Sequence, residues 1–401
     1  KHDFTTDPIK PRIDGEWVTA TGTTLGANNG IGMAAAMAVL EATDLQHGPL
    51  EMLLTVDEET GMTGAFGLKA GLLKGDILLN LDTEEEGDLC VGCAGGTNAN
   101  MKFYYDEKPV AGNVEALKIS VKGLKGGHSG VDINLERANS NKLLNRILWF
   151  AYNNLGMRLS SIDGGSLRNA IPRESFAVVT LPKENVEQFK KFIKDFTEIV
   201  INEYKNVEDT ITILVESVEL PSTIIDNVTT NNLLDAIYAT PNGVIRMSQD
   251  MKGLVETSTN LAIVKSKDGV IDVMCLLRSS VDTAKEDLEN MFASIYSLAC
   301  AESIFDGQYP GWKPNMDSPI LKEMLLAYEK QFGTKPHVSA IHAGLECGLL
   351  GGVYKNWDMI SFGPTINFPH SPAEKVNIPS VEKFWAFLTE TLKNVPVKEN
   401  A

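Results

Sequence analysis

The sequence predicts an α/β domain that is interrupted by an inserted α+β domain. Two short, continuous apolar runs, residues 50–56 and 77–81, are bounded by turn residues, which is typical of buried parallel strands. Residues 98–310 instead combine strand-like alternation with long amphipathic patterns, as in an antiparallel sheet covered on one face. After this region the sequence returns to the pattern of the first segment. We therefore expect an α/β domain made of residues 1–97 and 311–401.

The length and charge of the chain limit the possible architectures and partners. At 401 residues it exceeds the roughly 250–300 residues at which a single core stops growing, so we expect at least two domains. The net charge of −17 argues against nucleic acid and anionic membrane as partners, because both attract basic surfaces. No apolar run reaches the ~20 residues of a membrane-spanning helix.

In the first segment, residues 31–43 are rich in Ala, Met and Leu and favour a helix. The chain enters this helix through residues 26–30 (Gly-Ala-Asn-Asn-Gly), whose glycines allow a tight turn. Neither a phosphate-binding loop nor a dinucleotide fingerprint is present there, so nucleotide binding is only a weak alternative. The last segment is expected to contain a helix at 319–332, strands at 338–341 and 359–362, and a helix at 381–394.

The inserted region is expected to fold into strands and long helices. A hairpin over residues 260–277 should turn at Lys267-Asp268-Gly269, because Asp-Gly favours tight hairpin turns. The other expected elements are strands at 116–122, 176–181 and 210–218, and helices at 139–153, 186–204, 231–239 and 283–302.

The five cysteines are scattered and mostly lie in apolar contexts, which suits reduced, buried thiols in a cytoplasmic protein. Cys90 and Cys93 have the spacing of half a zinc knuckle. A second pair with that spacing is missing from the sequence, so these cysteines do not predict a zinc site.

Acidic residues follow both apolar runs of the first segment. Asp57, Glu58 and Glu59 come directly after the first run, and Asp82 closes the second. In an open α/β sheet, ligands bind at the carboxyl ends of the strands. Acids gathered there are costly to ionise together unless a cation neutralises them. The pattern favours a metal site with a spare carboxylate for proton transfer, and the alternative is a set of solvated loop acids.

Three of the six histidines lie in contexts that suggest a function. His370 lies in a Pro-rich loop after an expected strand, where functional residues concentrate. His128 is flanked by glycines that would let a ligand approach it, and His342 precedes Ala-Gly-Leu-Glu. For each of the three, the alternative is a structural or surface histidine.

Six motifs follow one another along the chain. They are Thr55-x-x-Glu58-Glu59-x-Gly61, residues 82–87 (Asp-Thr-Glu-Glu-Glu-Gly), 126–130 (Gly-Gly-His-Ser-Gly), 169–174 (Asn-Ala-Ile-Pro-Arg-Glu), 342–348 (His-Ala-Gly-Leu-Glu-Cys-Gly) and 370–372 (His-Ser-Pro). Together they resemble the aminoacyl-histidine dipeptidases, the cytosol non-specific branch of the M20 dinuclear zinc peptidases. The resemblance implies a zinc-bearing catalytic domain with an inserted lid domain. It also implies cytoplasmic homodimers that hydrolyse unblocked dipeptides, Xaa-His among them.

Carried over by position, the resemblance gives Glu58 the role of general base toward a water activated by zinc. Glu59 and His370 would bind one zinc ion, and Asp82 would bind the other. These assignments agree with the carboxylate and imidazole ligands that zinc takes in catalytic sites.

In the lid, the positions of His128, Asn169 and Arg278 match residues that contact substrate in the family, and Gly344 matches a backbone contact. The resemblance also implies that the lid forms the dimer. We expect residues 115–124 to offer a sheet edge and the helix at 139–153 a self-complementary face.

Two departures from the family pattern concern the metal. Asn28 stands where the family has a metal-bridging aspartate, and an amide offers one neutral oxygen in place of two anionic ones. The family's His-x-Asp motif would lie before Lys1. We therefore expect fewer than two zinc ions and low activity.

Two alternatives remain open on the sequence alone. One is an inactive or metal-poor homologue that binds peptides. The other is a different M20 chemistry, deacylation or aminopeptidase action on longer peptides.

Overall fold

The computed structural model describes residues 2–396 and separates into two compact units. The split unit combines Lys1–Cys93 with Pro310–Ala401, and the inserted unit is Ala94–Tyr309. The boundaries expected from the sequence, 97/98 and 310/311, lie slightly after the points at which the chain passes between the units. In the described part of the chain, no helix is long and apolar enough to cross a membrane.

The inserted unit is built on one large antiparallel sheet with the strand order β12-β7-β11-β9-β15-β16-β5-β17, and β14 pairs with β15. Its strands are β5 (Gly95–Tyr104), β6 (Glu107–Pro109), β7 (Val114–Lys122), β8 (Gly127–His128), β9 (Arg158–Gly164), β10 (Ala170–Ile171), β11 (Ser175–Pro182), β12 (Thr212–Ser217), β13 (Thr223–Ile225), β14 (Gly243–Met247), β15 (Val255–Lys267), β16 (Val270–Ser279) and β17 (Glu302–Tyr309). Short ladders join β8 to β10 and β6 to β13.

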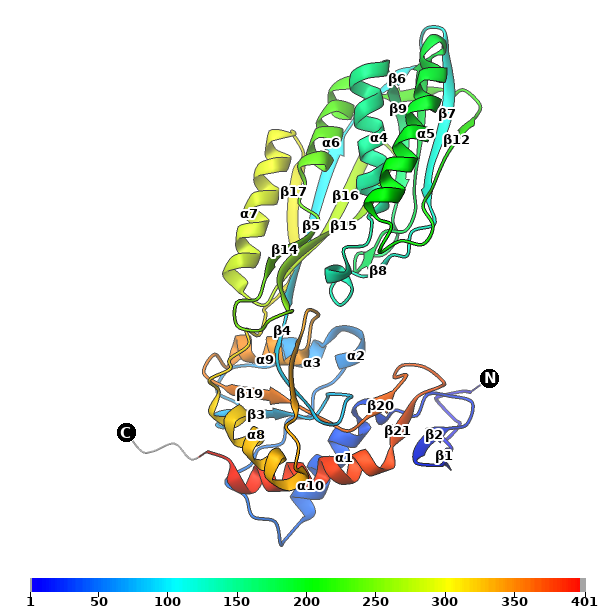
Figure 1. Ribbon diagram of the computed structural model, residues 1–401. Helices are drawn as coiled ribbons and strands as arrows, with labels where there is room; N and C mark the ends of the chain where they lie inside the picture. Colours follow the sequence, from blue (N-terminus) through cyan, green and yellow to red (C-terminus); the bar gives the residue numbers. More distant parts are fainter. Residues whose placement is uncertain (1, 397–401) are drawn as a thin grey trace. The chain divides into compact units, whose positions relative to one another are not determined.

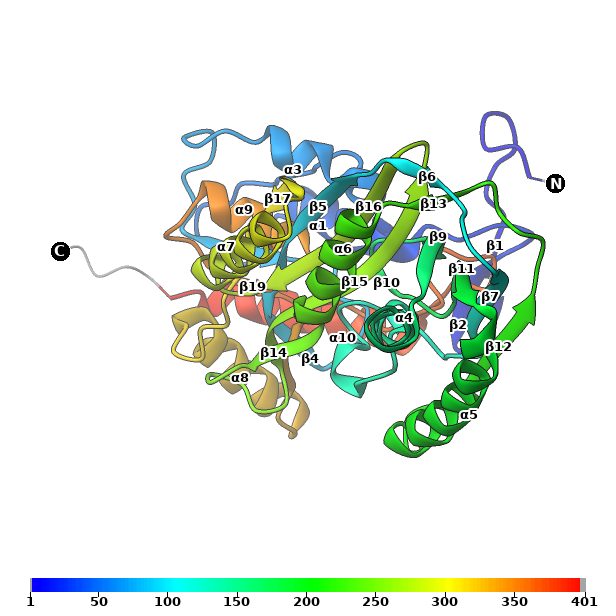
Figure 2. The same ribbon diagram turned by 90° about the horizontal axis from the view of Figure 1, so that it is seen from above.

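Four helices pack on this sheet: α4 (Ser140–Leu155), α5 (Val186–Glu203), α6 (Asn227–Ala239) and α7 (Asp282–Leu298). Figure 1 shows them side by side along the sheet, and Figure 2 shows α4 nearly end-on between α5 and α6. The apolar faces of these helices meet the sheet in one continuous core. The antiparallel sheet with a helical layer therefore confirms the expected α+β class for this region.

Two expectations about the inserted unit were wrong. Strand β7 is not a sheet edge, because it lies between β12 and β11, and the edge strand on that side is β12. Helix α4 does not offer a free face, since it packs against α5, α6 and the sheet and most of its residues are buried.

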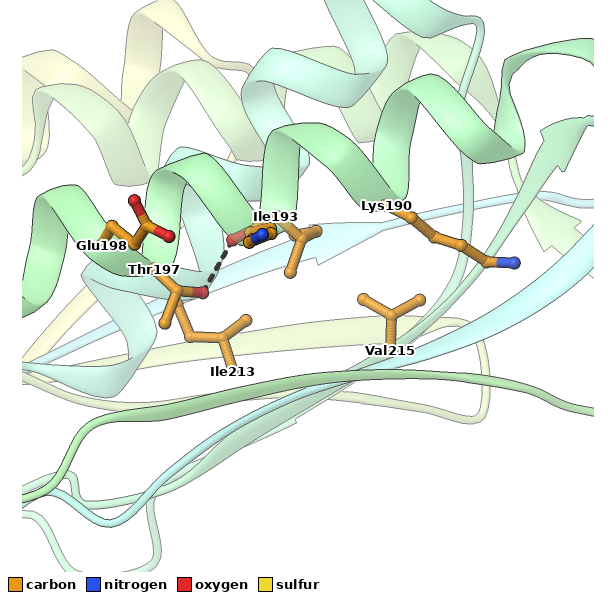
Figure 3. Close-up of a pocket in the computed structure, with 7 residues that line it drawn as sticks. Lys190, Ile193, Thr197, Glu198, Ile213 and Val215 are labelled. Atoms are coloured by element: carbon orange, nitrogen blue, oxygen red, sulfur yellow. Dashed lines mark hydrogen bonds between the residues drawn. The ribbon is translucent and has the colours of Figure 1, made fainter.

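The edge strand β12 and helix α5 enclose a groove of about 450 Å³. Figure 3 shows α5 above the groove, with Ile213 and Val215 of β12 below it. Lys190, Lys194, Thr197 and Glu198 of α5 also line it, so the groove has an apolar floor and a rim that carries charges of both signs.

The split unit contains two four-stranded sheets, with the orders β18-β4-β19-β3 and β1-β2-β21-β20. Its strands are β1 (Pro11–Asp14), β2 (Trp17–Ala20), β3 (Ile77–Asn80), β4 (Asp88–Cys93), β18 (His337–Ile341), β19 (Asp358–Ser361), β20 (Ile366–Asn367) and β21 (Lys375–Asn377). Its helices are α1 (Ala27–Glu41), α2 (Glu58–Gly61), α3 (Thr63–Gly67), α8 (Pro319–Phe332), α9 (Glu346–Val353) and α10 (Ile378–Asn394). Strand β3 pairs in parallel with β19, and β4 pairs in parallel with β18, but β19 meets β4 in the antiparallel direction, so the sheet is mixed. The strand expected at 77–81 is therefore parallel to a neighbour, but its residues are only half-buried.

The expected strand at residues 50–56 is absent from the described structure, where this run is irregular. Leu54 and Val56 are 60% and 69% exposed, so the run has no buried face. A strand needs a hydrogen-bonded neighbour, and an apolar run cannot supply one by itself. Glu58 and Glu59 consequently lie on the one-turn helix α2 and not in a strand-end loop.

The cysteine prediction was partly wrong. All five cysteines are free, and four of them are buried, but Cys300 is exposed. Cys90 and Cys93 lie on the buried strand β4, where burial raises the pKa of both thiols.

Candidate active site

The loops of the split unit bring Glu59 and His370 into direct contact. The Glu59 Oε2 atom lies 3.0 Å from the His370 Nε2 atom. Two ligands of one zinc ion, each ~2.0–2.2 Å from it, can lie at most about 4 Å apart, and this pair meets that condition. Neither side chain is fully buried, so the pair is accessible from solvent.

Asn28 joins this pair through its amide group. Its Nδ2 atom donates to Glu84 Oε1 at 2.8 Å and lies 3.3 Å from His370 Nε2. The Asn28 Oδ1 atom is buried and has no hydrogen-bond partner. The position therefore presents an NH₂ group to the imidazole nitrogen that would bind a metal. Glu84 belongs to a motif visible in the sequence, but the motif by itself gave it no role.

Asp82 is the most perturbed carboxyl group of the site. Its pKa is raised from 3.8 to about 8, first by burial and then by the nearby charges of Glu58, Glu59, Glu84 and Glu346. Its Oδ1 atom is buried without a hydrogen-bond partner. The charges that act on Asp82 all come from other carboxylates, so a bound cation would be needed to stabilise its ionised form.

Glu58 lies beside Glu59 on α2, directly after Asp57, whose backbone is left-handed with φ 64°. Burial raises the pKa of Glu58, as do the charges of Glu59 and Glu346, whereas His370 lowers it. A carboxyl group whose pKa is raised toward neutrality is suited to proton transfer.

Glu346, at the start of α9, is a further acid of this cluster that the sequence did not single out. Its side chain is buried, which raises its pKa, and its Oε1 atom has no hydrogen-bond partner. Gly344 lies in the turn that leads into α9. The sequence signal for Glu346 was its place in the motif that begins at His342.

The inserted unit brings together the three lid residues that the resemblance implied. His128 lies on β8, Asn169 directly precedes β10, which pairs with β8, and the Asn169 carbonyl accepts from Ser129 N at 2.8 Å. Arg278 is buried on β16 and donates to the Tyr309 hydroxyl at 3.0 Å. Burial lowers the pKa of His128, and the positive charge of Arg278 lowers it further.

The donors of the split unit fit a divalent cation in charge and in atom type, because carboxylate and imidazole groups lie together with unpartnered oxygens. These side chains contact one another in pairs, such as Glu59 with His370 and Asn28 with Glu84. Within residues 2–396, no three His, Cys, Asp or Glu side chains are placed so that they could hold one metal ion together. Asn28 turns an NH₂ group, which cannot bind a metal, toward Glu84 and His370.

Comparisons with known proteins agree with the motifs. The sequence matches Peptidase family M20/M25/M40 over residues 2–394. It is 46% identical over 397 residues to the cytosol non-specific dipeptidase of Escherichia coli (strain K12), a match that covers 99% of this chain and 82% of that protein.

The structure is similar to the crystal structure of the aminoacylhistidine dipeptidase from Vibrio alginolyticus, with a TM-score of 0.96 and 48% identity. That match covers 100% of this chain and 81% of the other. The aminopeptidase PepT from Bacillus cereus ATCC 10987 shares the fold, with a TM-score of 0.52 and 15% identity over 96% of this chain and 76% of that one. The chain therefore belongs to the M20/M25/M40 peptidase family.

Proposed function

We propose that this chain is a metal-dependent dipeptidase that hydrolyses unblocked dipeptides, Xaa-His among them. The observation that carries this proposal is the contact of Glu59 with His370, a pair of possible metal ligands. Glu58, whose raised pKa suits a general base, is the neighbour of Glu59 in the chain. The names of the relatives from Escherichia coli and Vibrio alginolyticus support the same activity. They give no support to the alternative of an inactive, metal-poor peptide-binding homologue.

In this proposal Glu58 removes the proton of the attacking water and returns it to the leaving amine. Glu59 and His370 would hold a zinc ion, with Asp82 available to a second one. When bound, zinc would polarise the scissile carbonyl and favour deprotonation of the water. Asn28 lacks the charge of a carboxylate and turns its NH₂ group toward His370, so it would weaken zinc binding by Glu59 and His370.

The resemblance gives residues of the inserted unit the role of donors to the substrate. Arg278 carries the guanidinium that suits a carboxylate in bidentate geometry, which fits the free carboxyl end of a dipeptide. His128 and Asn169 would donate to the oxygen on which negative charge develops. Gly344 would contribute a backbone contact to the substrate.

We further propose a cytoplasmic homodimer joined through the inserted unit. Because β7 is not an edge strand and α4 has no free face, we assign the interface to the open edge of β12 and the groove beside it. A second copy can extend the sheet by pairing its own β12, because an antiparallel pair of identical strands is self-complementary. The free cysteines and the cytosolic name of the relative from Escherichia coli support the location.

Replacing Glu58 or Glu59 by glutamine should separate proton transfer from metal binding. Glu58→Gln should lower kcat roughly 10²–10⁴-fold and leave the zinc content unchanged, because it removes a base and not a ligand. Glu59→Gln should lower the zinc content. Elemental analysis and turnover of an Xaa-His dipeptide measure both effects. Loss of zinc in Glu58→Gln, with residual activity proportional to metal, would reverse the two roles.

Asn28→Asp should strengthen zinc binding by at least about tenfold, since it adds an anionic ligand and second-sphere contacts alone change affinity 10–100-fold. Without metal it should lower Tm, because the new carboxylate replaces the amide that donates to Glu84. Asn29→Asp is the matched control. It adds the same charge one residue along and keeps the acceptor for Gly32 N. Equal zinc affinity in the two variants would contradict the assignment of Asn28.

The metal-free protein should lose stability as the pH rises from about 4 to about 8. The fold raises the pKa of Asp82 from its ordinary value of 3.8 to about 8, so the folded state retains a proton that the unfolded chain releases. Thermal unfolding in EDTA at pH 5 and pH 8 measures this slope, which Asp82→Asn should flatten. Saturating zinc should remove the loss at pH 8. An unchanged slope in Asp82→Asn would assign the effect to other groups.

Val215→Arg should convert a dimer into a monomer. The long charged side chain fills the groove, whose lining already includes Lys190 and Lys194 with Glu198 as the single acid, and it obstructs the surface of a second copy. Leu298→Arg is the control, because Leu298 is 87% exposed at the end of α7 in the same unit. Sedimentation velocity at micromolar concentration distinguishes the states. A monomer in the unsubstituted chain would refute this interface.

A further inference from the structure

A buried carboxylate, Glu374, lies between two segments: residues 24–30, where the chain enters α1 and the backbone of Asn28 is not yet helical, and the loop that carries His370. Both segments are called loops below. Its side chain accepts from four consecutive backbone amides. The Oε2 atom accepts from Leu25 N at 2.7 Å and Gly26 N at 2.8 Å. The Oε1 atom accepts from Ala27 N at 2.8 Å and Asn28 N at 3.2 Å. The Thr24 hydroxyl also donates to Oε2.

The backbone of Glu374 fixes the other loop. Its N–H donates to the Ser371 carbonyl at 3.0 Å, directly after His370. The Ser371 hydroxyl donates in turn to the Phe368 carbonyl at 2.8 Å, which closes the loop around His370. His370 and Phe368 both have left-handed backbones, with φ values of 60° and 55°, so this loop is held in a conformation that it would not adopt without contacts.

We propose that Glu374 is a positioning residue that sets the distance between Asn28 and His370. This inference rests on the proposed metal-dependent function, since the pair that it positions belongs to the candidate metal site. Glu374 itself does not reach that site, because both of its side-chain oxygens are taken up by the loop that begins at Thr24. It is 2% exposed, so water cannot replace the hydrogen bonds that it accepts.

The charge of Glu374 is what makes the arrangement specific. A carboxylate can accept all five donors, whereas an amide has one oxygen and would turn an NH₂ group toward N–H donors. Burial acts to raise the pKa of Glu374, but the hydrogen bonds from Thr24 and the backbone amides outweigh it and lower the pKa. The Glu374 carboxylate therefore holds residues 24–28, while the backbone N–H of the same residue holds the loop of His370.

Glu374→Gln tests this inference in the full chain, with cobalt(II) as the metal probe. The visible absorption of cobalt(II) reports its coordination and its affinity. We expect affinity to fall roughly 10–100-fold, the range found when a second-sphere partner is removed. Hydrogen exchange should also rise in residues 24–30 and 366–374, which contain the two loops.

Asp358→Asn is the matched control. Asp358 is another carboxylate that holds a helix start in the same unit, accepting from Ser318 Oγ at 2.6 Å and Ile320 N at 2.9 Å at the beginning of α8. It should lower Tm and raise exchange at the start of α8, while cobalt(II) affinity stays within about twofold of the unsubstituted chain. Thr24→Val is a milder second variant, because it removes one donor and keeps the carboxylate.

The outcomes separate this inference from the proposed function. Cobalt(II) affinity within twofold of the unsubstituted chain in Glu374→Gln, with Tm lowered as in Asp358→Asn, would reduce Glu374 to a structural residue. If the unsubstituted chain binds no cobalt(II), the metal proposal fails and exchange alone decides the role of Glu374. Increased exchange in both loops then supports it, and unchanged exchange in residues 366–374 overturns it. If Glu374→Gln does not fold, Thr24→Val gives the same readouts with smaller expected changes.

Discussion

The concentration of negative charge in the split unit is the constraint on which the rest of the site depends. Its members are Glu58, Glu59, Asp82, Glu84 and Glu346. Burial and mutual repulsion raise the pKa of Asp82 to about 8, and they raise that of Glu58. A carboxylate cluster can be stabilised by a cation or by retained protons, and either choice lowers its net charge. The unpartnered oxygen atoms of Asp82 and Asn28 show that hydrogen bonds do not complete this compensation.

The backbone assists this concentration of charge through conformations that are unfavourable for most residues. Asp57, directly before Glu58, and His370 both lie in the left-handed region. Such conformations cost on the order of 1–3 kcal/mol each and persist only where surrounding contacts hold them. Around His370 these contacts come from Ser371 and Glu374, and the same Glu374 holds the loop of Asn28. The positions of His370 and Asn28 thus depend on residues that would not themselves bind the metal.

The sequence was a good guide where one residue pattern determines the structure. Helix α8 begins and ends at the predicted residues, because its apolar face, N-cap Ser318 and C-terminal Gly333 are all local signals. The run at 50–56 failed because pairing is not a local property. Strand β5 was not predicted, although polar Asn98 and Asn100 alternate with buried Ala99 and Met101, which is the signal of a strand. The residue types of the site were visible in the motifs, but the role of Glu374 was not, because backbone donors leave no pattern in the sequence.

Asn28 shows why the identity of a residue and its orientation carry separate information. The sequence predicts that Asn28 lowers the affinity for a metal ion, since an amide lacks the charge of a carboxylate. The structure adds that the NH₂ end faces Glu84, where it meets a carboxylate oxygen, and so also faces the Nε2 atom of His370. The amide is therefore a competitor of a metal ion for access to Nε2, which also contacts Glu59 Oε2 at 3.0 Å. A carboxylate at this position would remove that competitor and repel Glu84 at the same time, so metal affinity and metal-free stability should change in opposite directions.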